Sequence, residues 1–268
     1  MRVAEEIEHR QWIAGGLCSL GALYVDVLAP DRARPLLERA LALAHELGSS
    51  VWAPYAAARM TMAYTQQRDF PKAGATLDGE LNADTPFESA PQLQLWCARA
   101  ELALARHAPD EALLIADKLA ASLSPGKVAP RVWIVRGEAL AGLASVEESE
   151  RILTAAIDAS RASGLRSLLW RAHAALGRLL RTRGRRDEAE RHVQSARALV
   201  DELATELTDG TLRQAFVERA ATQIPPRGLV SERRLKKQAF DGLTTREREV
   251  AALIAGACPT ALSATSWW

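Results

Sequence analysis

A small residue recurs at nearly constant spacing along the first two hundred residues of the chain. Successive copies lie 37 to 40 residues apart, at Gly21, Thr61, Ala100, Gly137 and Gly177. A repeat of this length constrains the fold more than any other feature, because one unit is too small to bury its own apolar face and has to pack against its neighbours. We therefore expect a stacked array of similar units.

Each unit has the composition and punctuation of two helices joined by a turn. The chain is rich in alanine and leucine but contains only 3 Tyr and 4 Phe, which favours helix over strand. Residues that break helices cluster at 28–34, 67–73, 107–112, 124–130 and 183–189. Four of these segments contain an aspartate that we expect to cap the next helix, at Asp31, Asp69, Asp110 and Asp187.

The first and last units place their small and apolar residues at the same offsets. Gly21 is followed by alanines 12 and 19 residues later, and so is Gly177. These offsets resemble the tetratricopeptide repeat, in which a small residue on the first helix lets the second helix approach closely. The resemblance implies an all-α, tetratricopeptide-like helical-hairpin solenoid over residues 1–224. It assigns repeat packing to Gly21, Ala33, Ala40, Gly137, Gly177, Ala189 and Ala196.

The concave face of such an array is the expected binding surface, either for a protein or peptide partner or for a small effector. No residue pattern identifies which side chains of that face make the contact. The tryptophans of the repeats lie among alanines and leucines at helical spacing, and we interpret them as packing residues rather than an aromatic ligand box. They are Trp52, Trp96, Trp133 and Trp170.

The sequence lacks the residue constellations that catalysis requires. Its five histidines are isolated on helical stretches, without a second His, Cys or acid at the spacing of a metal-ligand pair. It contains neither a phosphate-binding GxxxxGK[ST] loop nor a GxSxG nucleophile motif. We therefore predict no catalytic residue, no metal and no cofactor, and we interpret the chain as a protein that is not an enzyme.

The charge pattern gives no general attraction to nucleic acid or anionic lipid. Lys and Arg number 34 and Asp and Glu number 33, which leaves a net charge of +1. Arginines concentrate between Arg166 and Arg191, which we interpret as an exposed turn, with nucleic-acid contact as the alternative. The start of the chain is not a secretory leader and no apolar run reaches the ~18 to 20 residues of a membrane span. We expect a cytoplasmic protein without membrane association.

The C-terminal part of the chain changes character after the repeats. Residues 225–240 open with two prolines and are basic, which is typical of a linker. The stretch "LTTREREVAALIA", Leu243 to Ala255, has the pattern of a capped amphipathic helix. It closely resembles the opening of the LuxR-type helix-turn-helix domain, and the whole architecture is similar to the C-terminal part of the large ATPase-type regulators of the LuxR family.

This resemblance implies a role for individual residues. It assigns a helix-turn-helix core to Leu243, Val250, Leu253 and Ile254, and DNA contacts to Thr244, Arg246 and Arg248. In the family a recognition helix follows, and an ATPase module precedes the repeats, whereas this chain has neither. Residues 241–255 are therefore expected to be the first helix of a truncated helix-turn-helix, with only weak, salt-sensitive contact to DNA phosphates.

The last residues, 256–268, have no helical periodicity and end in two tryptophans. When they are written in GC-rich codons and shifted backward by one base, they spell a sequence close to the family's continuation. We therefore expect an out-of-frame, disordered tail. Its ending explains why a regular helix runs into residues that have no pattern.

The sequence thus predicts a fragment of a LuxR-family transcriptional regulator with impaired DNA binding. The alternative is a stand-alone helical-repeat scaffold that binds proteins without binding DNA. A third possibility is a remnant that associates with a full-length relative, and a homo-oligomer is compatible with each of these interpretations.

Overall fold

A computed structural model describes residues 2–82, 84–123 and 129–226. Within these ranges the chain forms helices and no strands. The residues after Pro226 form a separate unit, so the LuxR-like motif at 241–255, the end of the basic linker and the tail at 256–268 lie outside the described residues. In the part that is described, no helix combines the length and apolar character that crossing a membrane requires.

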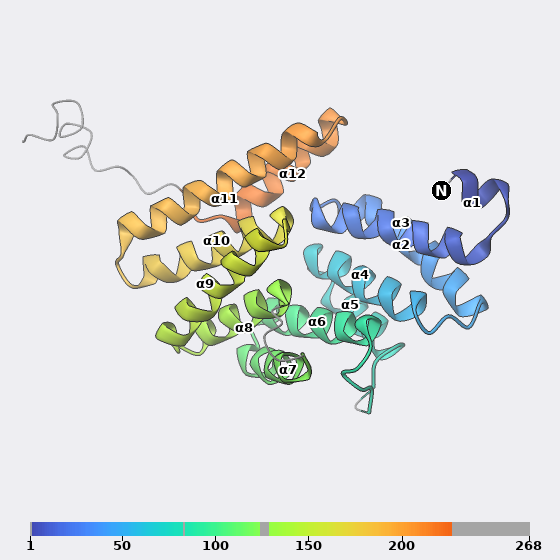
Figure 1. The fold of residues 1–268 in the computed structure, drawn as a ribbon, viewed down its shortest axis with the longest axis horizontal. Coiled ribbons are helices and arrows are strands. Elements are labelled where there is room, and N and C mark those ends of the chain that lie inside the picture. Colours follow the sequence, from blue (N-terminus) through green and yellow to red (C-terminus); the bar gives the residue numbers. More distant parts are fainter. Residues whose placement is uncertain (1, 83, 124–128, 227–268) are drawn as a thin grey trace, which may run out of the picture. The chain divides into compact units, whose positions relative to one another are not determined.

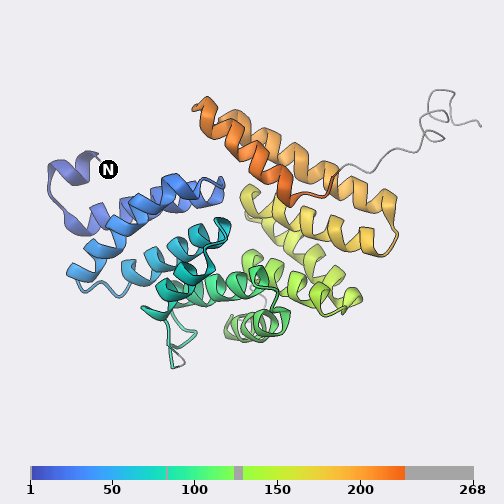
Figure 2. The same cartoon turned by 180° about the vertical axis from the view of Figure 1, so that it is seen from behind.

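The described helices follow one another as consecutive antiparallel pairs. Short turns fold α3 back on α2, α7 on α6, α9 on α8 and α11 on α10, while the shorter α5 packs on α4 and α12 packs on α11 (Figures 1 and 2). Their bounds are α1 Arg2–Glu6, α2 Arg10–Asp26, α3 Pro30–Glu46, α4 Trp52–Gln66, α5 Phe70–Asp78, α6 Ala90–Ala105, α7 Pro109–Ser122, α8 Pro130–Gly142, α9 Val146–Ala162, α10 Arg166–Thr182, α11 Arg186–Glu206 and α12 Gly210–Gln223. The predicted all-α array of helical hairpins is confirmed for these residues.

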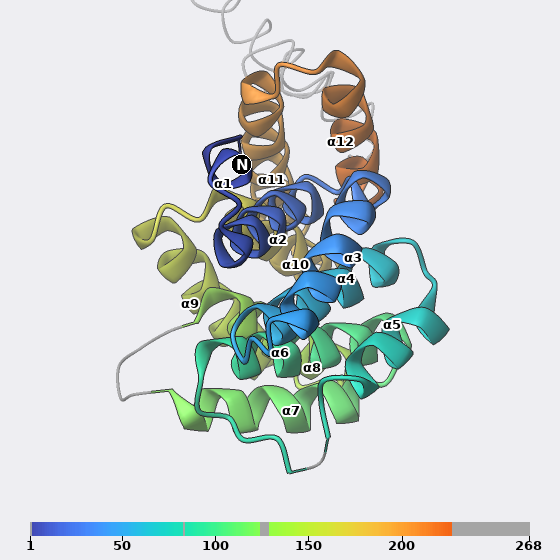
Figure 3. The same cartoon turned by 90° about the vertical axis from the view of Figure 1, so that its right-hand side faces the viewer.

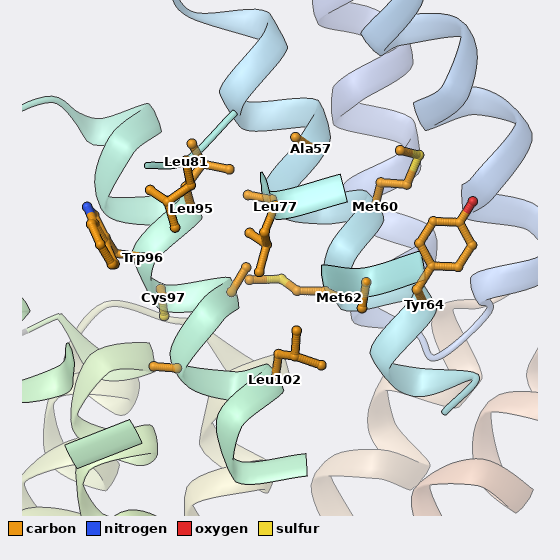
Figure 4. Close-up of a cluster of buried hydrophobic side chains, with 14 of the residues drawn as sticks. Ala57, Met60, Met62, Tyr64, Leu77, Leu81, Leu95, Trp96, Cys97 and Leu102 are labelled. Carbon is orange, nitrogen blue, oxygen red and sulfur yellow. The ribbon is translucent and has the colours of Figure 1, made fainter. Parts of the chain in front are cut away.

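The first helices of successive hairpins also contact one another. Helix α4 packs against α2 and α6, and α8 packs against α6 and α10. Each hairpin thereby covers the apolar face of the next, which is how a repeat array builds a continuous core. Part of this core lies between α4, α5 and α6, where Met62, Leu77 and Leu102 come together (Figure 4).

The predicted small positions lie where two helices of one hairpin approach most closely. A Cβ atom added to Gly21 would lie 2.6 Å from Leu37, and one added to Gly137 would lie 2.6 Å from Leu153. At Gly177 the corresponding contact is Val193 at 3.1 Å. The predicted packing alanines of the second helices are fully buried, at Ala33, Ala40, Ala189 and Ala196.

A recurring turn separates the helices at a period that the sequence alone did not reveal. One residue in each turn has a positive φ, and the following residue donates its N–H to the carbonyl five residues earlier, as Ala29 does to Tyr24 at 2.8 Å. This is the Schellman geometry. In the described residues it recurs at Glu8, Leu28, Gly48, Arg68, His107, Ala144, Gly164 and Gly184, mostly 20 residues apart.

The prediction that aspartates cap the second helices is right at one of the four positions. Asp69 accepts the backbone N–H of Lys72 at the start of α5. Asp31, Asp110 and Asp187 instead lie inside the first turn of their helices. At the first two a proline begins the helix before the aspartate, because its fixed φ suits the first helical position. There the aspartates stabilise the helix through its dipole only.

Candidate binding site on the inner face

Five first helices and the last helix surround one cavity of about 430 Å³. We call the sides of α2, α4, α6, α8 and α10 that line it the inner face. Helix α12 adds Thr222 and Gln223 to the lining. Elements from the whole length of the described chain therefore meet at this cavity, which makes it the best candidate for a binding site.

Helix α12 reaches the first hairpin of the array. The Arg219 guanidinium donates to the carbonyl of Leu28 at 2.6 Å and pairs with Asp31 at 3.0 Å, and this hydrogen bond lowers the pKa of Asp31. Leu28 is buried in the same apolar cluster as Phe216 of α12. Figure 3 shows α12 next to the α2–α3 hairpin. The last helix thus bounds one side of the cavity.

Charged side chains of the inner face form a chain of ion pairs across successive repeats. Asp26 of α2 lies 3.6 Å from Arg59 of α4 and 3.2 Å from Arg131 of α8, and Arg131 also pairs with Glu101 of α6 at 2.8 Å. The arginines are largely buried, since 11% of the Arg59 and 13% of the Arg131 side chain is exposed. Removing one partner would leave a buried charge unpaired.

A second pair lies nearer to α12. Arg178 of α10 forms an ion pair with Glu138 of α8 and donates to the carbonyl of Gln223 at 2.5 Å. It therefore connects two first helices to the end of the last helix. This contact makes the ion pairs of the inner face and the position of α12 depend on one another.

Arg171 of α10 differs from the other buried arginines of the cavity. Its Nε and Nη2 atoms are buried, and no described residue gives them a hydrogen-bond partner. Its guanidinium lies 5.4 Å from the ring centroid of Trp170. Burial lowers the pKa of Arg171, and repulsion from Arg131 lowers it further. The guanidinium thus stays charged in surroundings that disfavour its charge.

The sequence analysis missed these cavity residues, although the repeat register contains them. Glu101, Glu138 and Arg178 each directly follow a small position of the repeat, and all three line the cavity. Arg131 and Arg171 each lie six residues before a small position. The position relative to the small residue, rather than any local motif, is the signal that would have found them.

The described cysteines and histidines form no catalytic centre. Burial raises the pKa of Cys18 and Cys97 to about 12, so both thiols stay protonated and unreactive. Nδ1 of His173 lies 2.9 Å from Nδ1 of His192, a pair that the sequence analysis missed because the residues are 19 positions apart. In the residues with assigned positions, no three metal-binding side chains gather.

The arginines between Arg166 and Arg191 are mostly bound to acids. Arg166 pairs with Glu206, Arg183 with Glu147, and Arg185 with Glu150 and Glu188. These pairs are consistent with the interpretation as an ion-paired exposed surface. The predicted DNA-binding and helix-turn-helix residues lie outside the described residues, at Leu243, Thr244, Arg246, Arg248, Val250, Leu253 and Ile254.

The described part of the chain is therefore an array of tetratricopeptide-like helical hairpins. No family model and no curated protein matches the sequence. Two solved structures are similar, both of nearly identical TPR-like repeats from a Podosopora anserina protein named as a kinesin light chain, one of them a variant with a single substitution. Each is 18% identical, with TM-scores of 0.47 and 0.46 over 70% and 72% of this chain and 94% and 96% of the other. The likeness is one of fold.

Proposed function

We propose that the helical-hairpin array is a protein-interaction scaffold and that its inner face holds the partner. The observation that supports this most is the cavity itself, which takes side chains from six helices spread between Val25 and Gln223. Its ion-paired lining offers both charges and apolar surface, as binding surfaces of proteins do. The buried, protonated cysteines and the lone histidine pair give the same face no nucleophile or metal centre.

Site-specific photo-crosslinking in cells tests this proposal with the full chain. A benzophenone amino acid replaces Thr65 or Thr222, which line the cavity, or Thr154, which is exposed on α9 and does not line it. We expect one partner protein to be captured from both cavity positions and not from the α9 position. Capture from Thr154 alone, or from none of the three positions, would contradict a partner on the inner face.

A second candidate function is that of a transcriptional regulator of the LuxR type. It is favoured by the sequence from Leu243 to Ala255 and by the basic stretch before it. In this proposal the array senses an effector or associates with a second copy or a full-length relative, while Thr244, Arg246 and Arg248 make residual phosphate contacts. It remains a hypothesis from sequence, because these residues lie outside the described part of the chain.

A gel-shift titration against salt separates the two functions. Phosphate contacts predict binding to duplex DNA at low salt that weakens steeply as salt rises. Replacing Arg246 and Arg248 with Gln should reduce both the affinity and the salt dependence. If the parent chain does not shift DNA even at low salt, the regulator function is wrong and the scaffold function is unaffected.

A further inference from the structure

The charges around the cavity do not balance. Three buried or half-buried arginines have acidic partners: Arg59 pairs with Asp26, Arg131 with Asp26 and Glu101, and Arg178 with Glu138. These pairs use all of the acids that take part in them. Arg68 lies at the rim and is exposed to solvent. Arg171 is left as the one arginine at the cavity wall that is removed from water and has no ion pair with a described residue.

This arrangement is unfavourable without a further anion. A guanidinium removed from water loses hydration that only hydrogen bonds or an opposite charge can replace. Two nitrogens of Arg171 lack hydrogen-bond partners among the described residues, and the Trp170 ring supplies only a weak cation–π contact. Arg171 is half-buried and lines the cavity, so a rotation of its terminal torsions presents its planar fork to an incoming anion.

We propose that the inner cavity binds a small organic anion whose carboxylate or phosphate group is received by Arg171. Both groups match the bidentate geometry of a guanidinium. The remaining wall is partly apolar, from Val25, Met62, Ile134 and Leu168. A volume of about 430 Å³ suits a small molecule with an apolar body. This inference goes beyond the scaffold function, and it concerns a ligand that the chain binds on its own.

Calorimetric titration of the full chain with matched eight-carbon ligands tests the proposal. Octanoate and octyl phosphate carry the two candidate head groups, and 1-octanol is the neutral control. We expect at least one of the acids to bind more than tenfold more tightly than octanol. Binding of octanoate alone identifies a carboxylate ligand, and binding of octyl phosphate alone identifies a phosphate ligand. Equal binding of octanol, or no binding of either acid, would overturn the proposal.

The variant Arg171→Met removes the charge and keeps most of the apolar stem. We expect it to lose at least tenfold in affinity for the acid, while the melting temperature without ligand rises because an unpaired buried charge is gone. Arg99→Met is the matched control, since Arg99 pairs with Glu111 on α6 and does not line the cavity. It should leave acid binding unchanged.

Two results with these variants would contradict the role of Arg171. The first is unchanged acid binding by Arg171→Met. The second is a lower melting temperature of the ligand-free variant, which would show that the guanidinium is already satisfied inside the protein. Should Arg171→Met not fold, Arg171→Lys keeps the charge, and it must still prefer the acid over octanol. Because no partner protein takes part, failure here leaves the crosslinking test of the scaffold function untouched.

Discussion

Several turns of the array hold a left-handed backbone conformation without using glycine. The positive φ values fall on Glu8, Leu28, Arg68, His107 and Ala144, whereas Gly48, Gly164 and Gly184 supply the same geometry elsewhere. A side chain in this conformation crowds its own carbonyl, which costs about 1 kcal/mol. The array thus tolerates a local strain at these positions because helix packing on both sides fixes the turn.

Ala144 offers the cleanest test of this strain, since it is exposed and its φ is 61°. Ala144→Gly should raise the free energy of unfolding by about 0.5 to 1 kcal/mol, because relief of the strain exceeds the added flexibility of the unfolded chain. The reciprocal change Gly184→Ala should lower it by about 1 kcal/mol. Urea unfolding followed by circular dichroism measures both. A less stable Ala144→Gly variant would show that this turn is not left-handed.

The buried histidine pair predicts how stability responds to acid. Burial, His192 and Arg161 together lower the pKa of His173 from 6.5 to about 4 in the folded chain. Between these values the unfolded chain binds more protons, so stability falls as the pH falls from 6.5 towards 4, by up to about 1.4 kcal/mol for each pH unit. His173→Gln should flatten this part of the profile in thermal unfolding. An unchanged profile would mean that other groups govern the acid response.

At the scale of the helix pair, close approach depends on a missing side chain. A Cβ atom on Gly137 would lie 2.6 and 2.7 Å from two carbons of Leu153, which is fully buried and has little room to move. Gly137→Ala should therefore destabilise the chain by about 1 to 3 kcal/mol. Gly210→Ala is the control, because a Cβ there meets nothing within 4 Å. Equal stability of the two variants in urea would contradict a tight α8–α9 contact.

The sequence predicted the helical pairing for a physical reason, and it missed the cavity for another. Small residues such as Gly137 are visible in a single chain, because only a few residue types permit close approach. The partners of Arg131 lie on three different first helices, and only the stacking of the repeats brings Asp26 and Glu101 together. The pairing of His173 with His192 also follows from the 19-residue offset between hairpin partners, which was used for glycine and alanine alone.

At the scale of the whole described domain, the two ends of the array meet through few contacts. Arg32 pairs with Asp209 at 2.6 Å, and Arg219 bonds to Leu28 and Asp31, across sequence separations of 177 and 188 to 191 residues. Pairs as exposed as these contribute little individually. The buried side chains of Leu28 and Phe216 add apolar contact at the same place. The position of α12, and with it one wall of the cavity, is therefore held by a small, identifiable set of residues.

Arg219→Ala should loosen this closure without unfolding the array. It leaves the carbonyl of Leu28 without its side-chain donor and removes the pair with Asp31, a loss of about 1 to 3 kcal/mol where the carbonyl stays shielded from water. Because the hairpins pack through other residues, we expect faster amide exchange in the α2–α3 turn and in α12, with little change in α6 and α7. Arg183→Ala is the control, as its pair with Glu147 is exposed and distant from α12. If exchange rises evenly through all helices, α12 supports the whole array rather than closing one side of the cavity.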